Sequence, residues 1–206
     1  GAVAEHPASV IRPLLLPDSP VVIWWPGTAP QDQTGDELAQ LTLRRLTDAA
    51  AAPDPCAALE ARAAAYSPGD TDLSWTRLTP WRALLAAALD QYPATVTAAR
   101  LEAEADNPSA ELLAAWLRDR LAVEVTLTTS DGPGITAVRL TTDSGDIAVT
   151  RPDGRLAAYA VPGQPERRVA LKRRDTTELI TEELRRMDAD VVYEQTLQAL
   201  VDGGRR

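Results

Sequence analysis

The sequence is poor in the residue types on which many enzyme sites depend. Its 206 residues contain one cysteine, Cys56, and one histidine, His6. A single cysteine excludes an intramolecular disulfide, and a zinc site would have to be built mainly from carboxylates, which is unusual. A Ser-His-Asp or Cys-His mechanism would require His6. We interpret His6 instead as an exposed side chain near the start of the sequence, and we expect no metal site.

Long apolar runs and an excess of positive charge are also missing. No run approaches the ~20 apolar residues of a membrane span, and the first residues do not have the pattern of a secretory signal. The net charge is −9, which makes nucleic acid a poor partner because its phosphates attract cationic surfaces. We therefore expect a cytoplasmic protein that binds neither membranes nor nucleic acid.

No motif of a common enzyme class is present: the sequence lacks G-x-S-x-G, a Walker A loop, G-x-G-x-x-G and H-E-x-x-H. Asp70 and Asp72 form a D-x-D pair that could face a ligand. Alternatively, one of them caps a helical turn while the other pairs with Arg77 or Arg82. Cys56 has no basic neighbour in the sequence and is better interpreted as a small buried side chain. We expect no catalytic site and no cofactor.

The first third of the sequence has the pattern of an α/β domain. The run Val21–Trp25 is β-branched and aromatic and predicts a strand buried on both faces. A helix is expected over 55–65, whereas Leu41–Asp48 is compatible with a helix or a strand. A turn at 66–70 marks the predicted domain boundary. Residues 1–66 are therefore expected to be the C-terminal portion of an α/β domain.

Residues 67–206 are predicted to form an α+β domain. Thr79 as N-cap and Pro80 at the first helical position begin a helix with an apolar stripe from Trp81 to Leu89. From residue 123 to 171 the apolar period changes to two, and turns such as Asp153-Gly154 separate the short runs. This pattern predicts an antiparallel meander flanked by helices. The whole chain is thus expected to be α+β (mixed α/β).

Capping residues mark two further helices in this part. Asn107 precedes a proline, as at many helix starts, and Asp175 with Glu178 matches a capping box. The second of these helices is expected to bury the apolar side chains Ile180, Leu184 and Met187.

Tryptophan supplies much of the aromatic content because phenylalanine is absent. Trp24 and Trp25 are adjacent, so on a strand they point to opposite faces and cannot both enter one core. Tryptophan and arginine are also the residues that dominate interface hot spots. The sequence contains one basic cluster, which is either a solvated strand end or a phosphate site, since guanidinium groups match phosphate oxygens: Arg167, Arg168, Lys172, Arg173 and Arg174.

Two long stretches and four shorter ones resemble a known family. The long stretches are Pro13–Gly27, PLLLPDSPVVIWWPG, and Gly69–Arg82, GDTDLSWTRLTPWR. They are similar to the OpcA family, the glucose-6-phosphate dehydrogenase assembly proteins, in its actinobacterial branch. The shorter matching stretches are Gly132–Thr136, Arg151–Gly154, Pro162–Arg168 and Glu182–Arg186.

The resemblance implies a non-catalytic partner that promotes assembly or allosteric activation of glucose-6-phosphate dehydrogenase and thereby supports the pentose phosphate pathway and NADPH production. Family members are longer, so the chain resembles their C-terminal two-thirds. Cyanobacterial relatives respond to thioredoxin through cysteines near their C-terminal end, but no cysteine follows Cys56 here. From the motifs we infer a dehydrogenase-binding surface made of Trp24, Trp25, Asp70, Asp72, Trp75, Arg77 and Arg82.

Two alternative functions remain at this point. One is a sensor domain that binds a sugar phosphate or a nucleotide without turnover. The other is an enzyme that uses Asp70 and Asp72 on a phosphorylated sugar, with the basic cluster at 167–174 holding the phosphate. The shortage of histidine and cysteine disfavours the enzyme but not the sensor.

Overall fold

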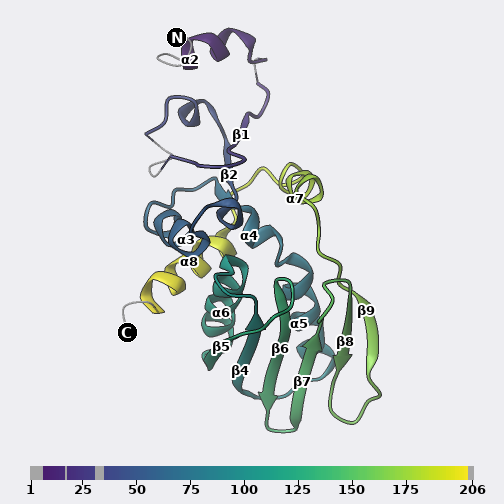
Figure 1. Ribbon diagram of the computed structural model, residues 1–206. Helices are drawn as coiled ribbons and strands as arrows, with labels where there is room; N and C mark the ends of the chain where they lie inside the picture. Colours follow the sequence, from purple (N-terminus) through teal and green to yellow (C-terminus); the bar gives the residue numbers. More distant parts are fainter. Residues whose placement is uncertain (1–6, 17, 31–34, 204–206) are drawn as a thin grey trace.

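The computed structural model describes residues 7–16, 18–30 and 35–203 (Figure 1). His6 lies outside these residues. The chain forms a three-stranded sheet and a six-stranded sheet, with helices packed around them. This arrangement confirms the α+β class expected from the sequence.

The small sheet is parallel, as expected for part of an α/β domain. Its strands are in the order β1-β2-β3, and helix α3 (Pro55–Ala64) connects β2 to β3. The Asp54 side chain caps α3 by accepting a hydrogen bond from the backbone nitrogen of Ala57. Strand β3 follows the expected boundary at 66–70 and nevertheless pairs with β2, which precedes it. The three strands are β1 (Val22–Trp24), β2 (Arg44–Thr47) and β3 (Asp70–Asp72).

Two expectations for this sheet can now be judged. Strand β1 is not buried on both faces, because Val22 and Ile23 are only half-buried and Trp24 is 38 % exposed. The strand lies at the sheet edge, with β2 on one side. The ambiguous stretch Leu41–Asp48 contains strand β2, whose four residues are all buried. The central position of β2 between two parallel neighbours explains this burial.

The six-stranded sheet has the order β5-β4-β6-β7-β8-β9. Helix α6 (Pro108–Leu121) connects β4 to β5, which run parallel, while β6 to β9 form an antiparallel meander. The predicted meander therefore begins at β6. It does not include β5, because β4 is inserted between β5 and β6. The strands are β4 (Val96–Ala103), β5 (Glu124–Thr129), β6 (Ile135–Thr142), β7 (Gly145–Thr150), β8 (Leu156–Ala160) and β9 (Arg167–Ala170).

Several helix ends follow local capping signals. Asn107 caps α6, and Asp175 with Glu178 forms the expected capping box of α7. Thr79 is not an N-cap: Leu78 precedes the helix, and the Thr79 hydroxyl donates to Glu182 at 2.7 Å. The remaining helices are α2 (Pro7–Ile11), α4 (Leu73–Thr76), α5 (Thr79–Gln91), α7 (Thr176–Glu183) and α8 (Val191–Gly203), with 3-10 turns η1 (Arg12–Leu14), η2 (Ala39–Leu41) and η3 (Ala49–Ala51).

The apolar face predicted for α7 is only partly correct. Leu184 follows the end of the helix and is 51 % exposed. Leu179 is fully buried in its place. The helix is too short to carry one stripe from Ile180 to Met187, so burial shifts to the turn that touches α4.

The main core lies between one face of the six-stranded sheet and helices α5 and α6 (Figure 1). The predicted stripe of α5 contributes Trp81, Leu85 and Ala88, all at least 98 % buried. Arg100 and Arg139 alternate with core residues of β4 and β6 and are exposed on the opposite face. Among the residues described, no helix is long and apolar enough to cross a membrane.

Candidate functional site

The stretch Gly69–Arg82 runs from β3 through α4 to the first turn of α5, between the small sheet and the helices that cover the large one (Figure 1). Many of its polar side chains bond to other groups of the protein. We call this cluster the polar joint; it consists of Arg44, Arg45, Asp48, Arg62, Asp70, Asp72, Trp75, Arg77, Arg82, Glu183 and Asp190.

Asp72 is the most enclosed member of the polar joint, with none of its surface exposed. Its Oδ2 accepts hydrogen bonds from the Thr47 hydroxyl at 2.6 Å and the Ala49 nitrogen at 2.8 Å. Its Oδ1 accepts from the Ser74 nitrogen at 2.9 Å and so caps α4. Arg62 Nε lies 3.3 Å from Oδ2 and balances the charge. The carboxylate therefore organises the fold and has no free side for a ligand.

Asp70 is also held from inside. It forms an ion pair with Arg45 Nε and accepts a hydrogen bond from the Ser67 nitrogen at 2.8 Å. Arg45 additionally donates to the Pro68 carbonyl at 2.6 Å. The adjacent turn is tight, because a Cβ on Gly69 would lie 2.6 Å from the Leu43 carbonyl oxygen. The D-x-D pair thus fixes the two ends of β3, with Asp70 at its start and Asp72 at its end, and does not present two free carboxylates.

Arg77 and Arg82 do not pair with the D-x-D carboxylates, and that expectation is wrong. Arg77 forms a bidentate pair with Asp48, with both N–O distances at 2.7 Å. The Arg82 guanidinium carbon lies 3.6 Å from the centroid of the Trp75 ring. Burial lowers the pKa of Arg82 to about 10, and the nearby Asp190 opposes this change. The partners come from other elements, which the local sequence could not specify.

Trp75 connects the polar joint to the C-terminal helix. Its indole Nε1 donates to Asp190 Oδ2 at 2.8 Å, just before α8. Its ring packs against Tyr193 at a centroid distance of 5.6 Å. Burial raises the pKa of Tyr193 well above its ordinary value. Trp75 is 1 % exposed, so its role in this structure is packing and orientation of α8.

Arg44 makes a second connection to the C-terminal segment. Its Nη2 contacts Glu183 Oε2 at 2.5 Å, and its Nη1 donates to the carbonyls of Arg186 and Asp188 at 3.1 and 2.6 Å. The Thr76 hydroxyl donates to the other oxygen of Glu183 at 2.7 Å. Burial raises the pKa of Glu183, and these two partners counteract the increase. Strand β2 is thereby tied to a segment about 140 residues later in the chain.

The residues of the expected dehydrogenase-binding surface differ in exposure: some are buried inside the protein and others reach solvent. Asp70, Asp72 and Trp75 are at least 92 % buried and have internal partners, so they offer no surface to another protein here. Trp24 is the most exposed tryptophan of the expected set, and Trp25 beside it is half-buried. Of the expected aromatic residues, those with exposed surface lie at the end of the edge strand β1 and directly after it.

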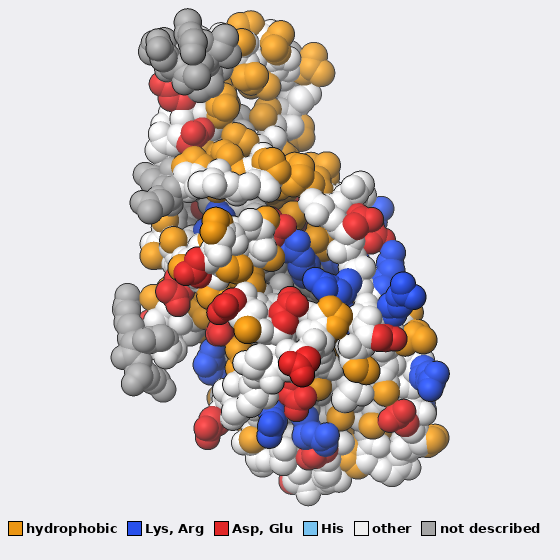
Figure 2. All heavy atoms as spheres, in the orientation of Figure 1, with side chains coloured by type: hydrophobic (Ala, Val, Ile, Leu, Met, Phe, Trp, Pro, Cys, Tyr) orange, Lys and Arg blue, Asp and Glu red, His pale blue; other side chains and the backbone are white. Residues whose placement is uncertain are grey.

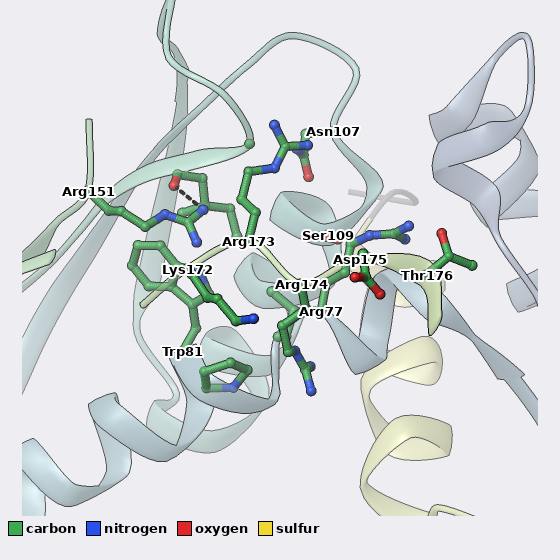
Figure 3. A pocket seen from close by; sticks show the side chains of 14 residues that line it. Arg77, Trp81, Asn107, Ser109, Arg151, Lys172, Arg173, Arg174, Asp175 and Thr176 are labelled. Carbon is green, nitrogen blue, oxygen red and sulfur yellow. Dashed lines mark hydrogen bonds between the residues drawn. The ribbon is translucent and has the colours of Figure 1, made fainter. Parts of the chain in front are cut away.

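A second arginine-rich region surrounds a cavity of about 260 Å³ beside the start of α5, β6 and the segment that leads to α7 (Figure 3). We call it the basic cleft. Figure 2 shows Lys and Arg side chains gathered over the upper part of the six-stranded sheet on this side of the molecule. The cationic residues that line the basic cleft are Arg77, Arg151, Lys172, Arg173 and Arg174.

Three of these five cations already have a carboxylate partner that is not part of the cleft lining: Arg77 with Asp48, Lys172 with Glu178 and Arg174 with Glu182. Two cations, Arg151 and Arg173, have no ion pair among the described residues. Asp175 is the one carboxylate in the described lining, and it caps α7. The basic cleft therefore keeps an excess of positive charge.

Arg151 is 5 % exposed and is held only by neutral groups. Its Nη1 and Nη2 donate to the carbonyls of Leu171 and Ile135 at 3.0 and 2.9 Å, while its Nε has no partner within the described part of the chain. Its guanidinium lies 4.9 Å from the centroid of the Trp81 ring, and Figure 3 shows it beside that ring. Burial lowers the pKa of Arg151 to about 10; the neighbouring Arg173 contributes to the decrease, and Asp153, which forms no ion pair with Arg151, opposes it.

The basic cluster expected from the sequence is likewise divided. Lys172, Arg173 and Arg174 line the basic cleft. Arg167 and Arg168 lie on β9 outside the lining, with exposed side chains. Sequence reasoning missed Arg151 as a cleft residue, although it begins the stretch Arg151–Gly154 that carries part of the family resemblance.

The other candidate side chains do not form a site. Cys56 is half-buried at the start of α3, and burial together with nearby carboxylates raises its pKa to about 11. Such a thiol remains protonated at neutral pH and is a poor nucleophile. Within residues 7–16, 18–30 and 35–203, no group of three or more His, Cys, Asp or Glu side chains could hold a metal ion.

Comparison with solved structures identifies a similar fold in a ketoreductase. A 3-ketoreductase from Actinomadura kijaniata matches with a TM-score of 0.52 and 12 % identity, over 94 % of this chain and 80 % of that chain. A UDP-N-acetylglucosamine 3-dehydrogenase from Acidithiobacillus ferrooxidans has a TM-score of 0.42 and 14 % identity, over 97 % of this chain and 85 % of that chain. At such identity the first match shows a shared fold alone.

Comparison with sequences gives a more specific result. No curated protein sequence matches the chain significantly. Two family models do match, and they describe the two domains of one glucose-6-phosphate dehydrogenase subunit: its N-terminal domain over residues 1–64 and its C-terminal domain over residues 68–197. The chain belongs to the OpcA family of glucose-6-phosphate dehydrogenase assembly proteins.

Proposed function

We propose that this protein is a non-catalytic partner of glucose-6-phosphate dehydrogenase that binds the enzyme and increases its activity. The family assignment over residues 1–64 and 68–197 carries this proposal, since both matching domains are named as parts of a dehydrogenase subunit. Activation of that enzyme in the cytoplasm would place the protein in the pentose phosphate pathway and NADPH supply.

A non-catalytic role agrees with the chemistry of the described residues. The D-x-D carboxylates of Asp70 and Asp72 are occupied by internal donors, and the thiol of Cys56 is protonated at neutral pH. The likeness to an oxidoreductase concerns fold at 12 % identity. The residues 132–137, GPGITA, match the Ala form of the dinucleotide motif, but they lead into strand β6 and not into the helix that such a motif requires. The fold is thus similar to that of an enzyme, while the D-x-D carboxylates of this protein are occupied by contacts within the fold.

We propose the edge strand β1 as part of the surface that binds the dehydrogenase. Trp24 is exposed there. Leu43, the residue directly before the neighbouring strand β2, is 54 % exposed. The N-terminal segments carry further exposed apolar side chains, and Figure 2 shows hydrophobic groups gathered over them. An edge strand also offers unpaired backbone groups to a partner. Exposed tryptophan beside apolar neighbours is typical of an interface hot spot.

The test is an activity titration of purified dehydrogenase with this protein. We expect saturable activation by the wild type, and about tenfold weaker binding, or 1.4 kcal/mol, for Trp24→Ser. Leu156→Ser is the control, because Leu156 is an exposed apolar side chain on strand β8 of the other sheet, at 50 % exposure compared with 38 % for Trp24.

The two possible failures have different meanings. If the wild type neither binds nor activates the dehydrogenase, the proposed function is wrong. If the wild type activates but Trp24→Ser and Leu156→Ser behave alike, the function stands and the β1 surface is rejected. Melting curves of both variants show whether each one is folded at the assay temperature.

A further inference from the structure

We propose that the basic cleft is a binding site for a small phosphate monoester. The inference goes beyond the binding of the dehydrogenase and does not depend on it, because the ligand would bind this protein alone. Three observations carry it: the unbalanced charge of the cleft, the placement of two guanidinium groups around one point, and the size of the cavity.

The charge argument begins with Arg151. A buried guanidinium ordinarily has a carboxylate partner, since an unpaired charge is costly to bury. Arg151 is 95 % buried, yet it bonds only to two backbone carbonyls, and its Nε is without a partner among the described residues. An anion in the adjacent cavity would supply the missing counter-charge, and charge-assisted bonds to a phosphoryl group are among the strong hydrogen bonds in proteins.

The guanidinium of Arg173 also lies beside Gly134, near that of Arg151. Gly134 has a φ of +68°, and the position that its Cβ would take lies 3.5 Å from Arg151 Nη2 and 3.9 Å from Arg173 Nε. Both guanidinium groups therefore lie within about 4 Å of one point beside Gly134, which lines the cavity, and we infer that one phosphoryl group there contacts both. Lys172 adds a third cation to the lining, and in Figure 3 Arg173 extends toward Asn107. Planar guanidinium forks suit phosphate oxygens better than a single ammonium does.

The cavity size limits the ligand. A volume of about 260 Å³ accommodates a phosphoryl group with a small polar remainder. Sites for larger ligands are typically ~300–1,000 Å³, so a dinucleotide is too large for the basic cleft. The hydroxyl of Thr176 and the carboxylate of Asp175 line the same cavity and can bond to ligand hydroxyl groups. A phosphorylated sugar or free phosphate has the required chemistry.

The test is isothermal titration calorimetry of the protein without the dehydrogenase, at fixed ionic strength. Inorganic phosphate and glucose 6-phosphate are the probes, and glucose is the neutral control. We expect saturable binding of both phosphate compounds and none of glucose. Tighter binding of glucose 6-phosphate identifies a phosphorylated sugar as the ligand, whereas equal affinity identifies the phosphoryl group alone. If neither phosphate compound binds saturably, the proposal is wrong.

A charge-matched pair of variants tests the location. Arg173→Gln removes a cation of the basic cleft, and we expect about tenfold weaker phosphate binding with an unchanged melting temperature. Arg168→Gln removes an exposed cation of β9 outside the cleft and should change the affinity by less than about twofold. Equal losses in the two variants would indicate attraction by overall charge and would overturn the assignment. Because both side chains are exposed, neither change threatens folding.

Discussion

The polar joint and the basic cleft are both rich in arginine, but they differ in how the charges are balanced. In the polar joint Arg44, Arg45 and Arg62 each contact a carboxylate of the fold. In the basic cleft Arg151 and Arg173 have no such partner among the described residues. Arg44, Arg45 and Arg62 thus have their charge balanced inside the fold, whereas we propose an external anion as the partner of the basic cleft. Arg82 of the polar joint is intermediate: it has no ion pair among the described residues and stacks on Trp75 instead.

Arg174 lies between the two regions and shows how close they are. It pairs with Glu182 and donates to the carbonyl of Thr76, whose hydroxyl bonds to Glu183 of the polar joint, while the Arg174 side chain also lines the basic cleft. The segment 172–175 therefore contacts both regions. Occupation of the cleft and the packing of α7 against α4 are expected to influence each other through this segment.

The largest effect is predicted for Asp72→Ala in the polar joint. The change leaves Arg62 buried without its partner and removes the cap of α4, so we expect a loss of about 3–5 kcal/mol in the free energy of unfolding, measured by denaturant titration. Asp54→Ala is the control, because Asp54 is an exposed cap of α3, and it should cost about 1 kcal/mol. Equal losses would mean that Asp72 acts as a cap only.

An intermediate effect is predicted for Arg82→Ala. Its guanidinium stacks on Trp75 and is largely buried, so we expect a loss of about 1–2 kcal/mol in unfolding free energy. Activation of the dehydrogenase per folded molecule should not change. Arg82→Lys keeps the charge but not the planar stack and should recover only part of the loss. If Arg82→Ala leaves the unfolding free energy unchanged and clearly weakens activation, Arg82 contacts the dehydrogenase and does not stabilise the polar joint.

The smallest effect is predicted for Cys56→Ser, which touches neither region. The raised pKa of about 11 leaves little thiolate at pH 7–8, so alkylation by iodoacetamide should be much slower than for free cysteine and should accelerate as the pH rises toward that pKa. The variant should retain its stability, its phosphate binding and its activation of the dehydrogenase. An oxidant-dependent activation that disappears in Cys56→Ser would contradict this prediction.

Much of the fold could be predicted because its signals are local. Two predicted helix caps are confirmed: the capping box of Asp175 and Glu178, and the cap formed by Asn107. Each of them acts within three residues. The Asp153-Gly154 turn joins β7 to β8 as expected, with Gly154 at a φ of +71°. The placement of β5 was not predictable in this way, because its pairing with β4 depends on the crossover through α6.

The candidate site was less predictable, since its members are distant in the sequence. The sequence drew attention to Gly69–Arg82 and to the basic cluster, but not to the partners of either. Arg44 meets Glu183 across 139 residues, and Arg151 meets the Leu171 carbonyl across 20. Without those partners, Asp70 and Asp72 could be interpreted equally as ligand-binding or as structural groups.

The sequence by itself determined the composition limits, the helix ends, the turns and the family, because each depends on residue type and short spacing. Only the tertiary structure decided which charges are neutralised, since a carboxylate and a guanidinium pair by distance in space and not by separation along the chain. In the folded protein Asp72 is buried beside Arg62, whereas Arg151 and Arg173 line an open cavity. Burial then makes the consequence large, because an unpaired charge is far more costly away from water than at the surface.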